Sequence, residues 1–249
     1  MNNATISGYI PKGTEGKSPI RVRTLDNGRI GIDFPLRVRR AYVRGEKAVY
    51  DYINCSYVVN AESKLPEHMH PGGSVIVNGR VQCDSYTNAN GERAYWNGVR
   101  VRELELIGSS SGANVTVIRG HLTKDAAVRS ANSTMVMEYT VAVRRNENKT
   151  DFIRCTSFAK DFSKLAPLMV KGLGVTVIGH IQTGSYEKDG QTIYTFSIIA
   201  DRLILENDKN QTRDSVSASA SPKSTSTQNF NSDGFEEMPE MDDDDDVPF

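Results

Sequence analysis

The sequence has few of the residues that would indicate a disulfide-stabilised or membrane-embedded protein. Among its 249 residues are three cysteines and one tryptophan, and 38% are hydrophobic. Cys55, Cys83 and Cys155 show no CxxC spacing and leave one unpaired, which argues against a disulfide framework or a zinc module and favours a reducing compartment. No apolar run approaches the ~18 residues that span a bilayer. The start, MNNATISGYI, does not resemble a secretory signal. We expect neither a membrane protein nor a secreted disulfide-rich one.

Patterns of catalysis and metal binding are also missing. The chain shows no nucleophile-elbow, phosphate-loop or metalloprotease motif. His68 and His70 flank Met69 without a third ligand at a suitable spacing, and five aspartates in a flexible terminus lack the fixed geometry of a cation site. We therefore expect no enzyme activity, no metal and no cofactor.

The balanced overall charge hides two segments of opposite sign. The formal net charge is -1. Residues 1–206, however, carry 27 Lys and Arg against 20 Asp and Glu, a net charge of +7, and residues 207–249 carry 3 against 11, a net charge of -8. A basic body with an acidic tail points to nucleic-acid binding together with an interaction tail. An ordinary solvated surface remains the alternative interpretation of the body's charge.

The segment that follows the body has the composition of a disordered linker. Residues 207–240 are rich in Ser, Thr, Asn and Gln and contain few large apolar side chains. Such a segment cannot bury enough apolar surface to offset the entropy lost on ordering. We expect a linker at 207–240, followed by an acidic tip at 241–249.

An internal repeat divides the body into two copies. At an offset of 100, residues 51–55 (DYINC) align with 151–155 (DFIRC), and 79–82 (GRVQ) align with 179–182 (GHIQ). After a shortened turn the offset becomes 99, and Tyr95 then matches Tyr194. Repeats of this kind indicate duplicated structural units. We predict domains at 1–108 and 113–206, joined by a linker at 109–112.

Each copy has the pattern of a β domain. In the second copy, five segments alternate or are rich in β-branched and aromatic residues, with turn signals between them: 116–122, 135–143, 151–158, 174–183 and 192–205. A helix is expected from Phe162 to Val170, ended by Gly172. Five strands with a helix between the third and fourth are typical of the OB-fold, a Greek-key barrel that binds oligonucleotides or oligosaccharides. The expected fold class is all-β, with two tandem OB-folds and a disordered acidic tail.

Three stretches of the second copy carry a further signal: residues 117–125 (VIRGHLTKD), 151–160 (DFIRCTSFAK) and 177–183 (VIGHIQT). In these stretches the chain resembles the bacterial single-stranded DNA-binding protein family, in the type with two OB-folds per chain. The chain end, MDDDDDVPF, resembles the family's acidic tip, although it has Asp243 where an aromatic residue is usual and Val247 in place of isoleucine. The resemblance implies a cytoplasmic, nucleoid-associated protein that coats single-stranded DNA during replication, recombination and repair. It also implies a homodimer that presents four OB-folds.

The resemblance also implies which residues contact DNA. The family's stacking aromatics correspond to Phe152, Phe158 and Tyr186. Its phosphate-contacting residues correspond to Arg129, Arg154, Lys160 and Lys171, and we add Arg144 and Arg145 at the end of the preceding strand.

Strand periodicity supports part of this assignment independently. Phe152, Arg154, Thr156, Phe158 and Lys160 share one parity, so they should line one face of a strand, while Ile153 and Cys155 point into the barrel. Aromatic rings and cations on one face are what sequence-tolerant binding of single strands requires. The alternative is that the two phenylalanines pack inside the barrel or at a subunit interface. Cys55 and Cys155 should be small buried hydrophobic residues.

The first copy carries different residues on the corresponding surface. Its candidate DNA contacts are Arg37, Arg39, Arg40, Tyr52, Tyr86 and Trp96. We expect both copies to bind DNA through non-equivalent surfaces, although Trp96 could equally be a packing residue.

The acidic tip is predicted to bind other proteins. Asp242, Asp243, Asp244, Asp245 and Asp246 precede Val247, Pro248 and Phe249, which ends in a free carboxylate. An apolar ring beside a carboxylate suits capture in a pocket rimmed by basic residues. By resemblance, such pockets belong to replication, recombination and repair proteins. The alternative for the tip is a solubilising tail. For the whole chain, the alternatives are an RNA-binding OB protein and a replisome adaptor whose OB domains bind protein.

Overall fold

The computed structural model describes residues 1–13, 17–44, 47–87, 91, 93–110, 112–131, 133–188 and 190–206. The expected linker at 207–240 and the acidic tip at 241–249 lie outside the described residues. None of the helices in the described part is long and apolar enough to cross a membrane.

The first copy folds into a closed Greek-key barrel. Its elements are β1 (Asn2–Tyr9), β2 (Arg21–Thr24), β3 (Ile30–Arg44), β4 (Lys47–Val59), α1 (Leu65–His68), β5 (Ser74–Thr87) and β6 (Arg93–Ile107). Strand β4 runs parallel to β6, and β1 pairs with β5 along its length and with β3 at its end. The order β1-β3-β4-β6-β5-β1 therefore closes on itself, as in an OB-fold.

The second copy repeats this arrangement. Its elements are β7 (Asn114–Leu122), β8 (Ala127–Ala131), β9 (Thr134–Arg144), β10 (Thr150–Ala159), η1 (Ala166–Leu168), β11 (Gly174–Lys188) and β12 (Gln191–Glu206). Strand β10 runs parallel to β12, and β7 pairs with both β11 and β9. The all-β prediction of two tandem OB-folds is confirmed.

Two local expectations were wrong in detail. Each copy has a sixth, short strand, β2 or β8, which pairs with the edge of the following strand and was not expected. The helix expected from Phe162 to Val170 is reduced to the single 3-10 turn η1. Pro167 has no amide hydrogen to continue a helix, and the buried Phe162, Leu165 and Met169 fix this segment against the barrel instead.

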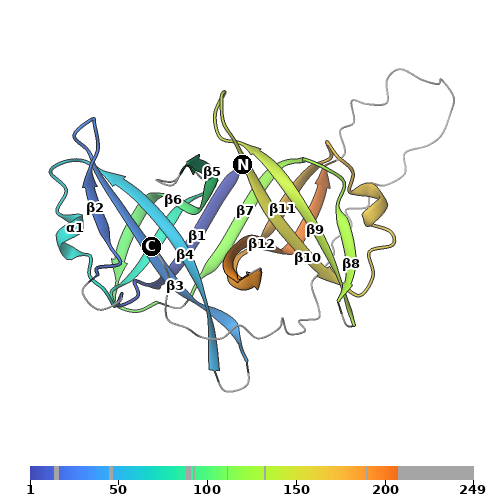
Figure 1. Cartoon of the computed structure of the whole chain (residues 1–249), viewed down its shortest axis with the longest axis horizontal. Coiled ribbons are helices and arrows are strands. Elements are labelled where there is room, and N and C mark those ends of the chain that lie inside the picture. Colours follow the sequence, from blue (N-terminus) through green and yellow to red (C-terminus); the bar gives the residue numbers. More distant parts are fainter. Residues whose placement is uncertain are drawn as a thin grey trace, which may run out of the picture.

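The two barrels lie side by side and share one continuous sheet (Figure 1). Strands β1 and β7 pair antiparallel between them, from Asn2 opposite Ile118 to Ile6 opposite Asn114. The pairing relates the copies by an approximate two-fold axis. The side chains of Asn2 and Asn114 accordingly make equivalent contacts, each joined by two hydrogen bonds to the backbone of its own barrel, at Val81 and Ile181 respectively.

A reciprocal pair of buried ion pairs reinforces the junction between the copies. Asp51 accepts a hydrogen bond from Arg40 at 2.8 Å and another from the Thr183 amide of the second copy at 2.7 Å. Asp151, at the equivalent position, is paired with Arg145 and accepts a hydrogen bond from the Cys83 amide of the first copy at 2.9 Å. The two aspartates are almost completely buried. Each carboxylate binds an arginine of its own barrel and accepts a hydrogen bond from a strand amide of the other.

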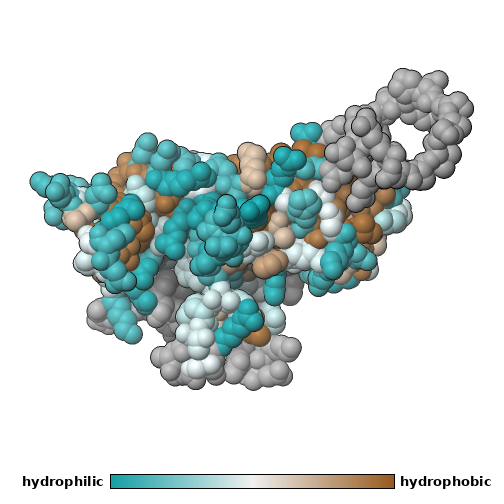
Figure 2. Space-filling view, turned by 90° about the horizontal axis from the view of Figure 1, so that it is seen from above, coloured by the Kyte–Doolittle hydropathy of each residue, from teal (hydrophilic) through white to brown (hydrophobic). Residues whose placement is uncertain are grey.

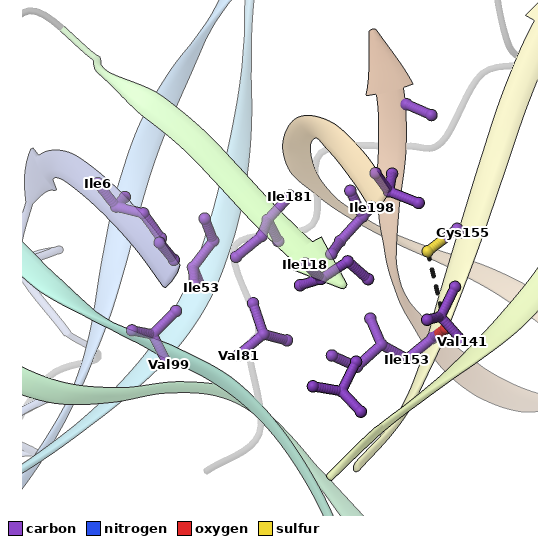
Figure 3. Close-up of a cluster of buried hydrophobic side chains, with 14 of the residues drawn as sticks. Ile6, Ile53, Val81, Val99, Ile118, Val141, Ile153, Cys155, Ile181 and Ile198 are labelled. Carbon is purple, nitrogen blue, oxygen red and sulfur yellow. Dashed lines mark hydrogen bonds between the residues drawn. The ribbon is translucent and has the colours of Figure 1, made fainter. Parts of the chain in front are cut away.

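The core is built from the inward parity of the strands. Figure 3 shows Ile6, Ile53 and Val99 clustered in the first barrel and Ile153, Val141 and Ile198 in the second. Cys55 and Cys155 are each 1% exposed, which confirms that they are small buried core residues. Burial raises the pKa of both thiols well above its usual value.

A β-bulge explains why a glycine recurs at the start of the aligned segments 79–82 and 179–182. The register between β5 and β6 shifts at Asn78/Gly79, and that between β11 and β12 shifts at Ile178/Gly179. A Cβ atom at Gly79 would collide with the Arg100 carbonyl oxygen, and one at Gly179 would collide with that of Ile199. The strands approach too closely there for any side chain, so both copies need glycine at this position.

Candidate nucleic-acid interface

Strand β10 presents alternating aromatic and basic side chains to solvent. Phe152 is 58% exposed, and Arg154 and Lys160 are exposed as well, while Phe158 is half-buried. Ile153, Cys155 and Ser157 between them are buried. The predicted alternation is therefore confirmed. A phenylalanine ring that is more than half exposed buries less than half of its apolar surface, so core packing does not explain its position.

The pairing register extends this face across β8, β9 and β10. Phe158 lies opposite Val136, which lies opposite Arg129 on β8, and Phe152 lies opposite Ala142 on β9. Directly opposed residues project from the same side of a sheet. The exposed face, here called the β10 face, therefore carries Arg129, Arg144, Phe152, Arg154, Phe158 and Lys160. Arg129 is 3.3 Å from Glu138 in an exposed ion pair.

Arg40 and Arg145 do not belong to an exposed face, contrary to the expectation from sequence. Their side chains are only 12% and 6% exposed, and both are committed to the buried aspartates at the junction. The reason is strand parity, because Arg145 shares the inward parity of Val143 and projects away from Arg144. Applying the two-residue period to the end of the strand would have separated Arg144 from Arg145.

Lys171 lies outside the β10 face. It is exposed in the turn between η1 and β11, where its amide donates to Asp125 at 2.8 Å.

The hairpins β5–β6 and β11–β12 carry exposed tyrosines. Tyr86 and Tyr186 are 54% and 48% exposed. Tyr95 and Tyr194 are 65% and 54% exposed and belong to the opposite faces of the same ribbons, since they pair with Ser85 and Ser185. The sequence prediction omitted Tyr194 and Tyr95 as site residues, although their match in the repeat was the signal that could have identified them.

On the first copy, basic groups lie against aromatic rings. The Arg37 guanidinium is 3.8 Å from the centre of the Tyr50 ring, and that of Arg100 is 5.7 Å from the Trp96 ring. Arg39 is exposed, while Tyr52 and Trp96 are half-buried. Where the β10 face has Arg154 and Phe158, this copy has Asn54 and Val58. The two copies therefore offer non-equivalent surfaces.

The described residues contain no group of three or more His, Cys, Asp or Glu side chains that could hold a metal ion. The remaining thiol, Cys83, is also unsuited to chemistry at neutral pH, because burial and the nearby Asp151 raise its pKa to about 12.

The geometry thus defines the class of the protein as a tandem OB-fold with an exposed aromatic and basic face. A family model described as "Single-strand binding protein family" matches residues 2–107 and again 113–205. The chain belongs to the single-strand binding protein family.

Similar proteins carry corresponding names. The chain is 39% identical over 93 residues to a single-stranded DNA-binding protein of Clostridium perfringens, a match covering 35% of this chain and 62%, less than two thirds, of that protein. It is 33% identical over 138 residues to single-stranded DNA-binding protein 2 of Staphylococcus aureus, covering 51% of this chain and 98% of the relative. The solved single-stranded DNA binding protein from Thermus aquaticus superposes with a TM-score of 0.66 at 19% identity, covering 88% of this chain and 97% of that one, which shows a shared fold.

Proposed function

We propose that the protein coats single-stranded DNA largely independently of sequence and is not an enzyme. The observation that carries this proposal is the β10 face, where Phe152 is 58% exposed and alternates with Arg154 and Lys160. Exposed rings stack on any base, and the cations between them follow the phosphates. Base stacking contributes about 1–3 kcal/mol per base, so two or three rings supply much of the affinity.

The test is a salt-series titration against a fluorescent oligo-dT, with matched duplex and RNA as competitors. We expect tight, stoichiometric binding that ignores duplex and weakens with salt. Equal preference for RNA would instead make this an RNA-binding OB protein, since nothing in the proposed contacts reads a 2′-hydroxyl.

A paired substitution separates DNA binding from a purely adaptor function. Replacing Phe152 and Phe158 by alanine should lower affinity for oligo-dT at least tenfold, because each lost stacking contact is worth about 1–3 kcal/mol. Leu168→Ala is the control, since Leu168 is 50% exposed but lies on η1 and is not a residue of the β10 face. Unchanged binding by the double variant would favour OB domains that bind protein.

The acidic tip is proposed to recruit replication, recombination and repair proteins. The five aspartates from Asp242 to Asp246 would speed encounter with a basic pocket rim, and Phe249 with its terminal carboxylate would fill the pocket. The tip should also compete weakly with DNA for the basic body at low salt. Deleting residues 241–249 should therefore raise oligo-dT affinity at low salt, and an unchanged affinity would contradict that competition.

The remaining proposals rest on the resemblance to the two-OB type of the family. They are assembly as a homodimer with four OB-folds and a cytoplasmic, nucleoid-associated location.

A further inference from the structure

Positive charge gathers in a cleft at the junction between the two copies. The cleft has a volume of about 460 Å³, and its lining includes Arg80, Arg100 and Arg102 from β5 and β6 together with Arg144, Arg145 and Asp151 from the second copy. Met1 lines it too, and Figure 1 shows the N-terminus between the two barrels. Figure 2 shows hydrophilic residues gathered across the middle of the molecule when it is viewed from above.

Four of these arginines lack an acidic partner among the described residues. Asp151 is already paired with Arg145, and Arg80, Arg100, Arg102 and Arg144 form no ion pair with any residue that the structure describes. Three of them donate hydrogen bonds to uncharged oxygens instead. Arg100 donates to Ser56 Oγ, Arg102 to Asn3 Oδ1 and Arg144 to the Asn146 carbonyl oxygen. Within the part of the chain that the structure describes, these four guanidinium groups, here called the arginine cleft, are therefore not neutralised by ion pairs.

The arrangement places like charges against one another. Arg80 and Arg100 are directly opposed in the register of β5 and β6, a position at which like charges are destabilising. Partial burial lowers the pKa of Arg100, and the nearby Arg23 and Arg80 lower it further, while Asp33 and Asp84 act in the opposite direction. An anion bound in the cleft would relieve this repulsion.

The second copy does not repeat the cluster. The pairing registers make Arg80, Arg100 and Arg102 equivalent to His180, Ile199 and Asp201. There the histidine is 3.3 Å from the aspartate, and Ile199 is buried. The approximate two-fold axis therefore relates the three arginines of β5 and β6 on one side of the junction to a histidine, an isoleucine and an aspartate of β11 and β12 on the other. A requirement of the fold would appear in both copies, so the fold alone does not explain the arginines.

The cleft is continuous with the β10 face. Arg144 is two residues beyond Ala142, which lies opposite Phe152, and Ala142 and Arg144 share the outward parity of β9. Arg144 thus belongs to both surfaces and links the exposed phenylalanine of the second copy to the arginines of the first.

We infer that the arginine cleft is a phosphate-binding site at which single-stranded DNA passes from the β10 face of the second copy onto the first copy. The planar donors of arginine match the oxygen pairs of a phosphodiester. The DNA crosses the junction on this side, because Arg80, Arg100 and Arg102 have only His180, Ile199 and Asp201 as counterparts on the other. The inference rests on the proposed function, and it adds the path of the strand.

The test compares two triple variants of the full-length chain that lose the same charge. The first is Arg80→Gln, Arg100→Gln and Arg102→Gln, and the control is Lys12→Gln, Lys17→Gln and Lys64→Gln, three exposed lysines of the same copy that lie outside the cleft. Affinity is measured over a salt series with a dT oligonucleotide of about 35 residues and with one of about 8, short enough for a single OB-fold. Circular dichroism and thermal unfolding verify that both variants fold.

For the long oligonucleotide we expect the cleft variant to lower affinity at least tenfold at low salt. Its salt slope should fall by about 2, since each phosphate contact on a single strand contributes about 0.7. The short oligonucleotide and the lysine control should change little. A loss equal to that of the control would overturn the inference. Tighter binding by the cleft variant would also overturn it, because the arginines would then hold a competing anion such as the Asp242–Asp246 run. Failure of the unmodified protein to bind either oligonucleotide would instead reject the proposed function.

Discussion

Arg144 and Arg145 show how one step along a strand decides the role of a side chain. Arg144 is exposed on the β10 face, whereas Arg145 is buried against Asp151 and Asp84. The hydrogen bond to Asp151 raises the already high pKa of Arg145, so its charge is permanent. A buried arginine that stays charged destabilises the fold unless an acidic group lies beside it. The Arg145–Asp151 ion pair is therefore part of the structure of the junction.

Asp151→Asn should destabilise the protein by about 3 kcal/mol, because it leaves a buried arginine with only the partly exposed Asp84 as partner. Glu138→Gln is the control, since its pair with Arg129 is more than half exposed on both sides and should contribute less than about 1 kcal/mol. Urea unfolding monitored by circular dichroism gives both values. Equal effects would show that the junction does not depend on this pair.

Asp84 should contribute to the acid sensitivity of the fold. Partial burial opposes ionisation of its carboxyl, but hydrogen bonds from Arg145 and Gln82 outweigh this and hold the pKa below its ordinary value of 3.8. A depressed carboxyl pKa stabilises the fold above the ordinary value and loses that contribution as pH falls through the folded-state value. The difference in unfolding free energy between the native protein and Asp84→Asn should be constant from about pH 5 to 8 and shrink below about pH 4. A difference independent of pH in urea titrations would contradict this account.

At the scale of the element, strand alternation predicted the long strands and the exposed side of β10. It failed for β2 and β8, because four or five residues are too few to establish a period. These two short strands form by pairing with the edges of β3 and β9. The helix at 162–170 was overestimated because a periodic run of apolar residues also fits a turn packed on a barrel. The two-residue period accounts for the buried side chains of Arg40 and Arg145, but local sequence does not specify their contacts with Thr183 and Asp84 of the other copy.

The glycine in each β-bulge allows a test of how closely the two paired strands approach each other. Gly179→Ala should cost about 3 kcal/mol or more, because the added Cβ would overlap the Ile199 carbonyl oxygen on the neighbouring strand. Gly108→Ala is the control, since no atom lies within 4 Å of a Cβ built there. Thermal unfolding of the two variants measures the contrast. A Gly179→Ala protein as stable as the control would mean that the bulge relaxes without cost.

At the scale of the molecule, the repeat in the sequence predicted two copies of one fold, but it could not predict how they pack. The pairing of β1 with β7 and the crossed aspartate contacts join residues more than sixty positions apart, and the arginine cleft combines residues of β5 and β6 with residues of the second copy. Such contacts leave no periodic signal in a single sequence.

The oligomeric state of the protein can be measured directly. We expect light scattering to give twice the chain mass of 27.5 kDa, as the resemblance to two-OB members of the family implies. Val115 and Leu106 are apolar side chains that are 53% and 45% exposed, and we propose that a second chain covers them. Val115→Asp with Leu106→Asp should shift the mass towards that of a monomer, whereas a monomeric mass for the unmodified protein would contradict the proposed dimer.

The pairing of β1 with β7 within one chain has a consequence for how such a protein can change over generations. When two identical subunits meet about a symmetry axis, every substitution appears on both sides of the interface. Here each copy has its own codons, so three arginines can occupy one side while a histidine, an isoleucine and an aspartate occupy the other. Covalent duplication therefore frees the halves of the pair to diverge, and it allows a nearly symmetric scaffold to acquire a directional surface.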